Sequence, residues 1–91
     1  MTDIQHENVF FSGRVQGVGF RYTTLQIAKE FEVTGYVTNL SDGRVQVEAE
    51  GRAEQIKAFV AAIQERMHGF IRKTEQKTTP ATGEFRGFTI K

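Results

Sequence analysis

Cysteine is absent from this chain of 91 residues. Its absence excludes a disulfide framework, catalysis by a thiolate and a zinc site built on cysteine ligands. Long apolar runs are also absent, since the longest, residues 58–63, is far too short to cross a bilayer. The N-terminal segment, residues 1–7, has neither a basic region nor an apolar stretch, so we expect that it is not a secretory leader. Together these absences favour a cytoplasmic location.

The chain has almost no net charge. Its 12 Lys and Arg residues against 11 Asp and Glu residues leave a formal charge of +1, whereas general nucleic-acid binders carry a clear basic excess. We therefore expect no nucleic-acid partner and no membrane partner, although a local basic pocket for one small anion remains open. Hydrophobic residues make up 38% of the chain, which is enough for one core. We expect residues 1–91 to form a single domain and to act as a monomer.

The hydrophobic pattern changes from a strand period to a helix period along the first half of the chain. Residues 8–14 are rich in strand formers, and so are residues 33–40. Between them, residues 20–32 carry a stripe at the spacing of one helix face. This stripe consists of Phe20, Thr24, Ile27, Ala28 and Phe31. The pattern predicts a strand, a helix and a second strand.

The second half repeats this order. The pair Asp42-Gly43 predicts a hairpin turn, and residues 44–50 alternate in polarity as a half-buried strand does. We expect Gly51 to end that strand and residues 53–67 to form a second amphipathic helix. Residues 71–79 are compatible with a polar edge strand, and residues 88–90 with a short final strand.

The element order β-α-β-β-α-β defines the expected fold class. Each helix has one apolar face, which must cover the same face of an antiparallel sheet. We therefore predict an α+β protein with a ferredoxin-like α/β sandwich and a short extra strand at the C-terminal end.

A glycine-rich loop joins the first strand to the first helix. Gly13, Gly17 and Gly19 allow the backbone to turn successive N–H groups inward, which forms a concave anion site at the start of a helix. The candidate phosphate-binding residues are Val15, Gln16, Gly17, Val18, Gly19 and Phe20. The loop matches neither a P-loop nor a dinucleotide fingerprint. From spacing alone, a glycine-rich connection without a ligand is as consistent as an anion site.

Arg21 and Asn39 are the two side chains that suit phosphate chemistry. Arg21 lies in the first turn of the predicted helix, where the helix dipole disfavours a cation unless an anion binds there too. Its planar fork can donate two parallel hydrogen bonds to phosphate oxygens, although a solvent-exposed Arg is the alternative. Asn39 could orient a water without repelling phosphate, although Asn is also common at turns.

Other residue types suggest no competing chemistry. His6 and His68 have no metal-ligand pattern around them, and we interpret both as surface residues. Asp42 is most simply a turn residue. The sequence contains no recognisable Ser-His-Asp arrangement and no paired carboxylates for acid–base catalysis.

Two motifs resemble the signatures of the acylphosphatase family. The first is Gly13-Arg14-Val15-Gln16-Gly17-Val18-Gly19-Phe20-Arg21, and the second runs from Gly35 through Asn39 to Val45 and ends at Gly51. The resemblance covers the whole chain, including residues 88–90. It implies a ferredoxin-like fold and the hydrolysis of carboxyl-phosphate anhydrides without metal or cofactor. It also implies that Arg21 binds the substrate and Asn39 orients the water.

One segment departs from the family pattern, and three other functions compete with this one. Residues 70–77 are more polar than the apolar alternation common in the family. An RNA-recognition domain is disfavoured because residues 44–50 contain no aromatic residue and two acids. A module that only binds an anion stays open. A carbamoyl-phosphate-handling domain of a larger maturation enzyme is disfavoured by chain length and by the absence of a linker.

The mechanism that we expect is an in-line attack of water on phosphorus. Loop amides and Arg21 would hold the phosphoryl oxygens, and Asn39 would hold the water opposite the carboxylate leaving group. The resemblance suggests that the substrate's own phosphate accepts the proton of the water. The expected partners are an acyl-phosphate substrate and inorganic phosphate or sulfate as product or inhibitor.

Overall fold

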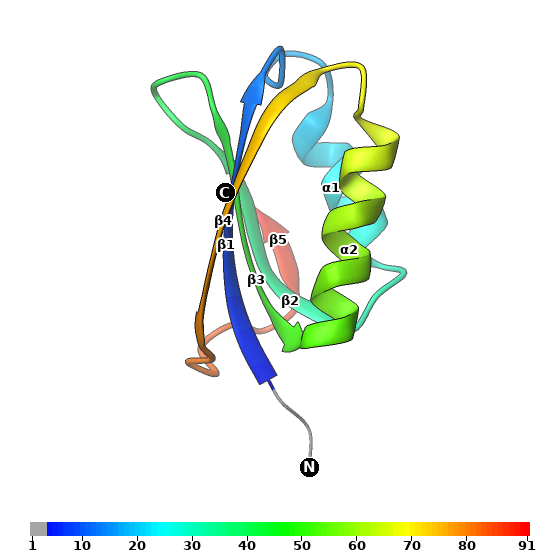
Figure 1. The fold of residues 1–91 in the computed structure, drawn as a ribbon. Coiled ribbons are helices and arrows are strands. Elements are labelled where there is room, and N and C mark those ends of the chain that lie inside the picture. Colours follow the sequence, from blue (N-terminus) through cyan, green and yellow to red (C-terminus); the bar gives the residue numbers. More distant parts are fainter. Residues whose placement is uncertain (1–3) are drawn as a thin grey trace.

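A five-stranded sheet carries both helices on one of its faces (Figure 1). The computed structural model describes residues 4–91. Residues 1–3, the first part of the segment that we expect not to be a leader, lie outside the described residues. The strands are β1 (Ile4–Gly13), β2 (Val33–Asn39), β3 (Val45–Arg52), β4 (Ile71–Pro80) and β5 (Phe88–Ile90), and the helices are α1 (Phe20–Ala28) and α2 (Ala53–Arg66). The predicted ferredoxin-like sandwich is confirmed.

The strand order across the sheet is β4-β1-β3-β2-β5. Strand β1 pairs antiparallel with β3 and β4, and β2 pairs antiparallel with β3, as expected. Strand β5 instead runs parallel to β2, with Ile90 opposite Val37. The sheet is therefore mixed, because the chain crosses over after β4 and enters the far edge in the direction of β2.

The two predicted helix stripes form the core together with the inner faces of β1, β2 and β3. Phe20, Thr24, Ile27 and Ala28 are buried on α1 and Ile56, Phe59, Val60 and Ile63 on α2. Phe11 of β1 packs against Phe20 with ring centroids 5.2 Å apart, and Phe59 packs against Phe88 of β5 at 5.4 Å. These contacts hold the start of α1 and the strand β5 against the sheet. No helix within residues 4–91 is long and apolar enough to span a membrane.

Three predicted boundaries are wrong. Strand β1 begins at Ile4 rather than at residue 8. Helix α1 ends at Ala28 rather than at Glu32, because the next three N–H groups bond to carbonyls three residues back and tighten the chain into a turn. Gly51 does not end β3, since it pairs with Val33 inside the sheet. A Cβ at Gly51 would lie 2.6 Å from the Glu32 carbonyl oxygen, so close backbone approach explains this glycine.

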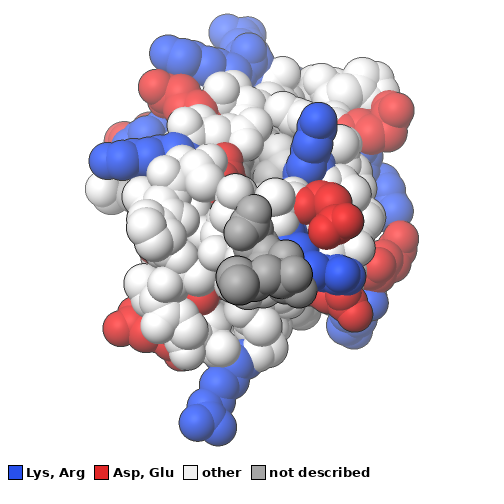
Figure 2. All heavy atoms as spheres, turned by 60° about the horizontal axis from the view of Figure 1, so that its bottom comes forward, with Lys and Arg blue, Asp and Glu red and all other residues white. Residues whose placement is uncertain are grey.

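The polar strand β4 lies at one edge of the sheet, as predicted from its composition. Lys73, Glu75 and Lys77 keep that edge charged, which discourages pairing with another chain. Figure 2 shows Lys and Arg interspersed with Asp and Glu on the face that it presents. Among the described residues, this face (Figure 2) has no continuous patch of positive charge, so it does not favour a nucleic-acid interface there.

The outer face of the sheet carries an acidic hydrogen-bond network. His6 lies between two carboxylates, with Nδ1 2.7 Å from Glu50 Oε2 and Nε2 2.8 Å from Glu48 Oε1. Glu50 also accepts hydrogen bonds from the backbone N–H groups of Thr82 and Gly83 at 2.7 and 2.9 Å. The expectation that His6 is a surface residue is wrong, because its side chain is only 12% exposed. Acids at these positions also argue against RNA binding on this face.

This network makes the stability of the fold depend on pH. Burial opposes protonation of His6, but hydrogen bonds and charges from Glu50 and Glu48 outweigh it and raise the pKa of His6 above 6.5. Burial likewise opposes ionisation of Glu50, but hydrogen bonds from Thr82, His6 and Gly83 outweigh it and lower the pKa of Glu50 to about 2.

We expect the free energy of unfolding to fall at both ends of the pH range. The contribution of His6 is complete below 6.5, the ordinary pKa of histidine, and is lost as pH rises through its higher pKa in the fold. The contribution of Glu50 is complete above 4.5 and is lost as pH falls towards about 2. Urea unfolding at a series of pH values measures both. His6→Gln should remove the loss above pH 6.5, and His68→Gln should not; equal pH profiles for His6→Gln and the unchanged chain would contradict the assignment.

Candidate functional site

The glycine-rich loop between β1 and α1 has the backbone of an anion site. Gly17 and Gly19 have φ angles of +77° and +79°, which only glycine adopts readily. Gly19 is the N-cap of α1, and no side chain caps this end of the helix. The first turn of α1 contains no acidic residue, unlike that of α2, which contains Glu54. The start of α1 thus presents N–H groups and a positive dipole end without an anion of its own.

Contacts on three sides hold this loop in place. The Val15 side chain is completely buried, and Phe20 is buried against Phe11. The Gln16 side chain donates hydrogen bonds to the carbonyls of Leu40 and Arg44, at 2.8 and 2.9 Å. Loop 14–19 and the β2–β3 hairpin therefore lie side by side at one end of the molecule, which is the upper end in Figure 1.

A hollow of about 240 Å³ opens between the loop, the start of α1 and the ends of β2 and β5. It is lined by Val15, Gly17, Gly19, Phe20, Arg21, Tyr22, Asn39 and Ile90. The fold thus brings the two predicted chemical residues, Arg21 and Asn39, into one hollow. Gln16 and Val18 do not line it. The Gln16 side chain donates hydrogen bonds to the hairpin, and Val18 is partly buried and packs against the core.

Tyr22 and Ile90 are the lining residues that sequence reasoning missed. Tyr22 directly follows Arg21, so its position in the same helix turn was the available signal. No local signal pointed to Ile90, because the parallel pairing of β5 with β2 brings it here.

The guanidinium group of Arg21 is free for a ligand. Among residues 4–91, no side-chain hydrogen bond or ion pair involves this group, and the residue is exposed. A cation without a partner in the first turn of a helix is unfavourable, and a bound dianion would reverse that effect. The position therefore suits the recognition of phosphate.

Asn39 ends β2, and its side-chain oxygen faces no partner. Oδ1 is buried and accepts no hydrogen bond within residues 4–91. The turn that follows is closed by other groups: Leu40 N donates to Arg44 O at 2.8 Å, and Asp42 Oδ1 accepts from Arg44 N at 3.1 Å. Asp42 is thus the turn residue that we expected, whereas Asn39 is not needed for the turn. An unpaired buried oxygen costs about 1–3 kcal/mol, which calls for an explanation.

The polar groups of the hollow suit an anion. Arg21 is the charged residue among its lining residues, which include no carboxylate and no histidine. Within residues 4–91 no group of three or more His, Asp and Glu side chains is arranged to hold a metal ion. The arrangement can therefore bind a phosphoryl group with Arg21 and backbone N–H groups and hold a water at Asn39.

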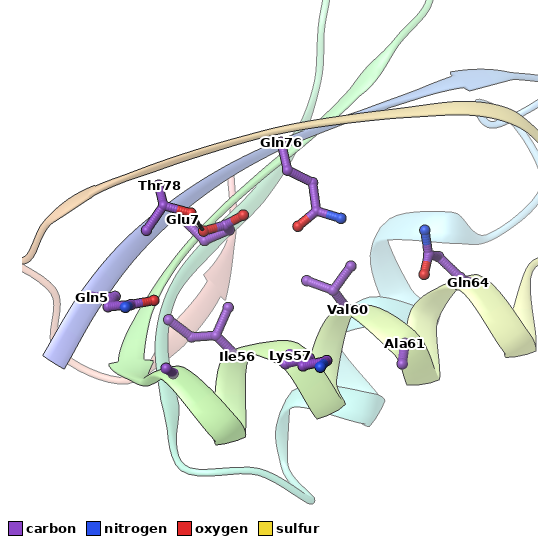
Figure 3. Close-up of a pocket in the computed structure, with 10 residues that line it drawn as sticks. Gln5, Glu7, Ile56, Lys57, Val60, Ala61, Gln64, Gln76 and Thr78 are labelled. Carbon is purple, nitrogen blue, oxygen red and sulfur yellow. Dashed lines mark hydrogen bonds between the residues drawn. The ribbon is translucent and has the colours of Figure 1, made fainter. Parts of the chain in front are cut away.

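A larger hollow, of about 420 Å³, lies elsewhere, between α2 and the strands β1 and β4 (Figure 3). The buried Glu7 carboxylate lies at its wall and accepts a hydrogen bond from Thr78 Oγ1 at 2.6 Å. A carboxylate would repel a phosphoryl group, and the lining contains neither Arg21 nor Asn39. Size alone would select this hollow, but its chemistry does not suit phosphate.

Known proteins match the chain over almost its full length. A model of the Acylphosphatase family matches residues 7–90. An acylphosphatase from Roseiflexus sp. (strain RS-1) is 38% identical over 91 residues, which cover 99% of this chain and 98% of that protein. The crystal structure of an acylphosphatase from Bacillus subtilis superposes with a TM-score of 0.84 at 28% identity, covering 94% of this chain and 97% of that one. The crystal structure of HypF from T. kodakarensis has a TM-score of 0.81 at 35% identity, with 96% of this chain matching 12% of that one.

Proposed function

The chain belongs to the acylphosphatase family and is a hydrolase of acyl phosphates, and we propose that it acts through Arg21, Asn39 and the loop 15–20. Its substrate is an acyl phosphate, and inorganic phosphate is its product. We further propose that residues 1–91 act as one domain, as a monomer in the cytoplasm, without nucleic-acid or membrane partners.

In this mechanism the phosphoryl group binds at the start of α1. The N–H groups of the loop and the two parallel donors of Arg21 share its oxygens, and they also stabilise the charge that these oxygens carry in the transition state. The glycines at positions 17 and 19 allow this close approach of the backbone. Because buried Val15 and Phe20 and the hydrogen bonds of Gln16 hold the loop in place, it is organised before the substrate arrives.

Asn39 positions the water that attacks phosphorus. The Oδ1 atom accepts a hydrogen bond from the water, which directs a water lone pair towards the phosphorus atom. The new bond joins the water oxygen to phosphorus, and the bond between phosphorus and the acyl oxygen breaks. The bonding electron pair leaves with the carboxylate. Because no carboxylate or histidine lines the hollow, the proton of the water passes to a phosphate oxygen of the substrate.

This proposal rests on one observation: the free guanidinium of Arg21 and the unpartnered buried amide oxygen of Asn39 lie in the same hollow. Neither group has a structural task there among residues 4–91, and each matches one end of the reaction. An anion-binding module without activity would need Arg21 and the loop but would have no use for the Asn39 oxygen.

We expect the purified chain to hydrolyse benzoyl phosphate in excess EDTA and to hydrolyse p-nitrophenyl phosphate far more slowly. Benzoate is a better leaving group than p-nitrophenolate because benzoic acid is the stronger acid, and no carboxylic acid or histidine lines the hollow to assist the poorer leaving group. Steady-state rates with both substrates under identical conditions measure this difference. Loss of benzoyl phosphate hydrolysis in EDTA, or equal rates on both substrates, would contradict the mechanism.

A further inference from the structure

Two exposed apolar side chains lie at the hollow that contains Arg21 and Asn39. The large hydrophobic residues that stay exposed within residues 4–91 are Ile4, Tyr22 and Ile90, and Tyr22 is 63% exposed. Both Tyr22 and Ile90 line this hollow. An aromatic ring left in water beside a binding site is available to cover an apolar part of a ligand.

These two residues belong to elements in different layers of the fold. Tyr22 lies in the first turn of α1, next to Arg21, in the helix layer. Ile90 lies in β5, which pairs with β2, so it belongs to the sheet layer that also carries Asn39. Figure 1 shows these two layers with α1 on one side and the sheet on the other.

An in-line displacement requires the attacking water and the leaving group to approach and leave from different directions. The attacking water and the leaving carboxylate lie on opposite sides of phosphorus. If Asn39 holds the water on the sheet side, the acyl group extends towards the helix side, where Tyr22 lies. The phosphoryl oxygens are the same in every acyl phosphate, so Arg21 and the loop cannot distinguish one acyl group from another.

We propose that the ring of Tyr22 forms an acyl-binding subsite that makes the enzyme select aromatic acyl phosphates over small ones such as acetyl phosphate. This inference rests on the proposed function of the hollow. A phenyl ring of the substrate would stack on or against the Tyr22 ring, and both surfaces would leave water. A methyl group is too small to gain from that contact.

The test is the ratio of kcat/KM for benzoyl phosphate to kcat/KM for acetyl phosphate. Tyr22→Ala should lower this ratio by about three- to tenfold, which is the range expected for losing one aromatic contact. Tyr22→Gln should lower it similarly, and Tyr22→Phe should retain it because the ring remains. Ile4→Ala is the control, an exposed apolar residue that does not line this hollow, and it should leave the ratio unchanged.

The outcomes separate this inference from the function on which it rests. If the unchanged protein hydrolyses neither substrate, the proposed function fails and the subsite fails with it. If it hydrolyses both, and folded Tyr22→Ala and Tyr22→Gln keep the original ratio, the subsite alone is wrong. A ratio that falls in Ile90→Ala and not in the Tyr22 variants would place the acyl group against Ile90 and overturn the assignment. Circular dichroism of each variant checks the fold.

Discussion

Arg21→Lys is expected to lose about 10²-fold or more in kcat/KM for benzoyl phosphate although it conserves the charge. The planar guanidinium donates two parallel hydrogen bonds to two phosphoryl oxygens, whereas the compact ammonium of Lys cannot reproduce that fork. The Lys side chain also ends at a different point above the loop, and a shift of about 1 Å in a positioned site costs on the order of 10²-fold. Arg21→Ala should lose at least as much.

The fold should survive both substitutions at Arg21. The guanidinium makes no hydrogen bond or ion pair to the rest of residues 4–91, and a cation at this end of α1 is unfavourable without an anion. The measurement combines circular dichroism, steady-state kinetics and inhibition by inorganic phosphate. Phosphate at about a hundredfold excess over its dissociation constant should stabilise the unchanged protein by about 2.7 kcal/mol, and this effect should weaken in Arg21→Ala.

Arg14→Lys is the matched control for this experiment. Arg14 is exposed, begins the same loop and does not line the hollow. The same exchange of side chains there should leave kcat/KM unchanged. If folded Arg21→Lys keeps nearly the full kcat/KM, bidentate recognition is wrong and Arg21 supplies only a diffuse positive charge.

Asn39→Ala is expected to lose about 10²–10³-fold in kcat while inorganic phosphate still inhibits at a similar concentration. The substitution removes the acceptor that orients the water and leaves Arg21 and the loop intact. Mutants of the two residues should therefore fail differently, with Asn39 affecting turnover and Arg21 affecting binding as well.

Stability should separate this role of Asn39 from a role in the turn. The buried Oδ1 atom has no partner within residues 4–91, so its removal relieves an unfavourable burial, and the melting temperature should not fall. Asn8→Ala is a control of the same residue type on the outer face, where the side chain bonds to Gln46. Normal turnover in Asn39→Ala combined with a lower melting temperature would show that Asn39 is a turn former.

The sequence by itself determined the local elements and one half of the site. Helical stripes predicted both helices, and strand-forming residues, alternation at residues 44–50 and turn signals indicated the strands, with residues 71–79 only compatible with one; all of these are properties of neighbouring residues in the chain. The same local logic placed Arg21 in the first turn of α1, after glycines that the loop conformation requires. The predicted end of β3 was wrong at Gly51, because a distant segment determines the conformation there: the Gly51 backbone approaches Glu32.

The tertiary structure alone decided what surrounds Arg21. The Gln16 side chain joins the loop to the β2–β3 hairpin and so brings Asn39 to the hollow, and the parallel pairing of β5 brings Ile90. Strand pairing also placed His6 between Glu48 and Glu50, which its sequence neighbours did not indicate. Strand register and strand order depend on how apolar faces pack across the whole sheet, so no local pattern specifies them.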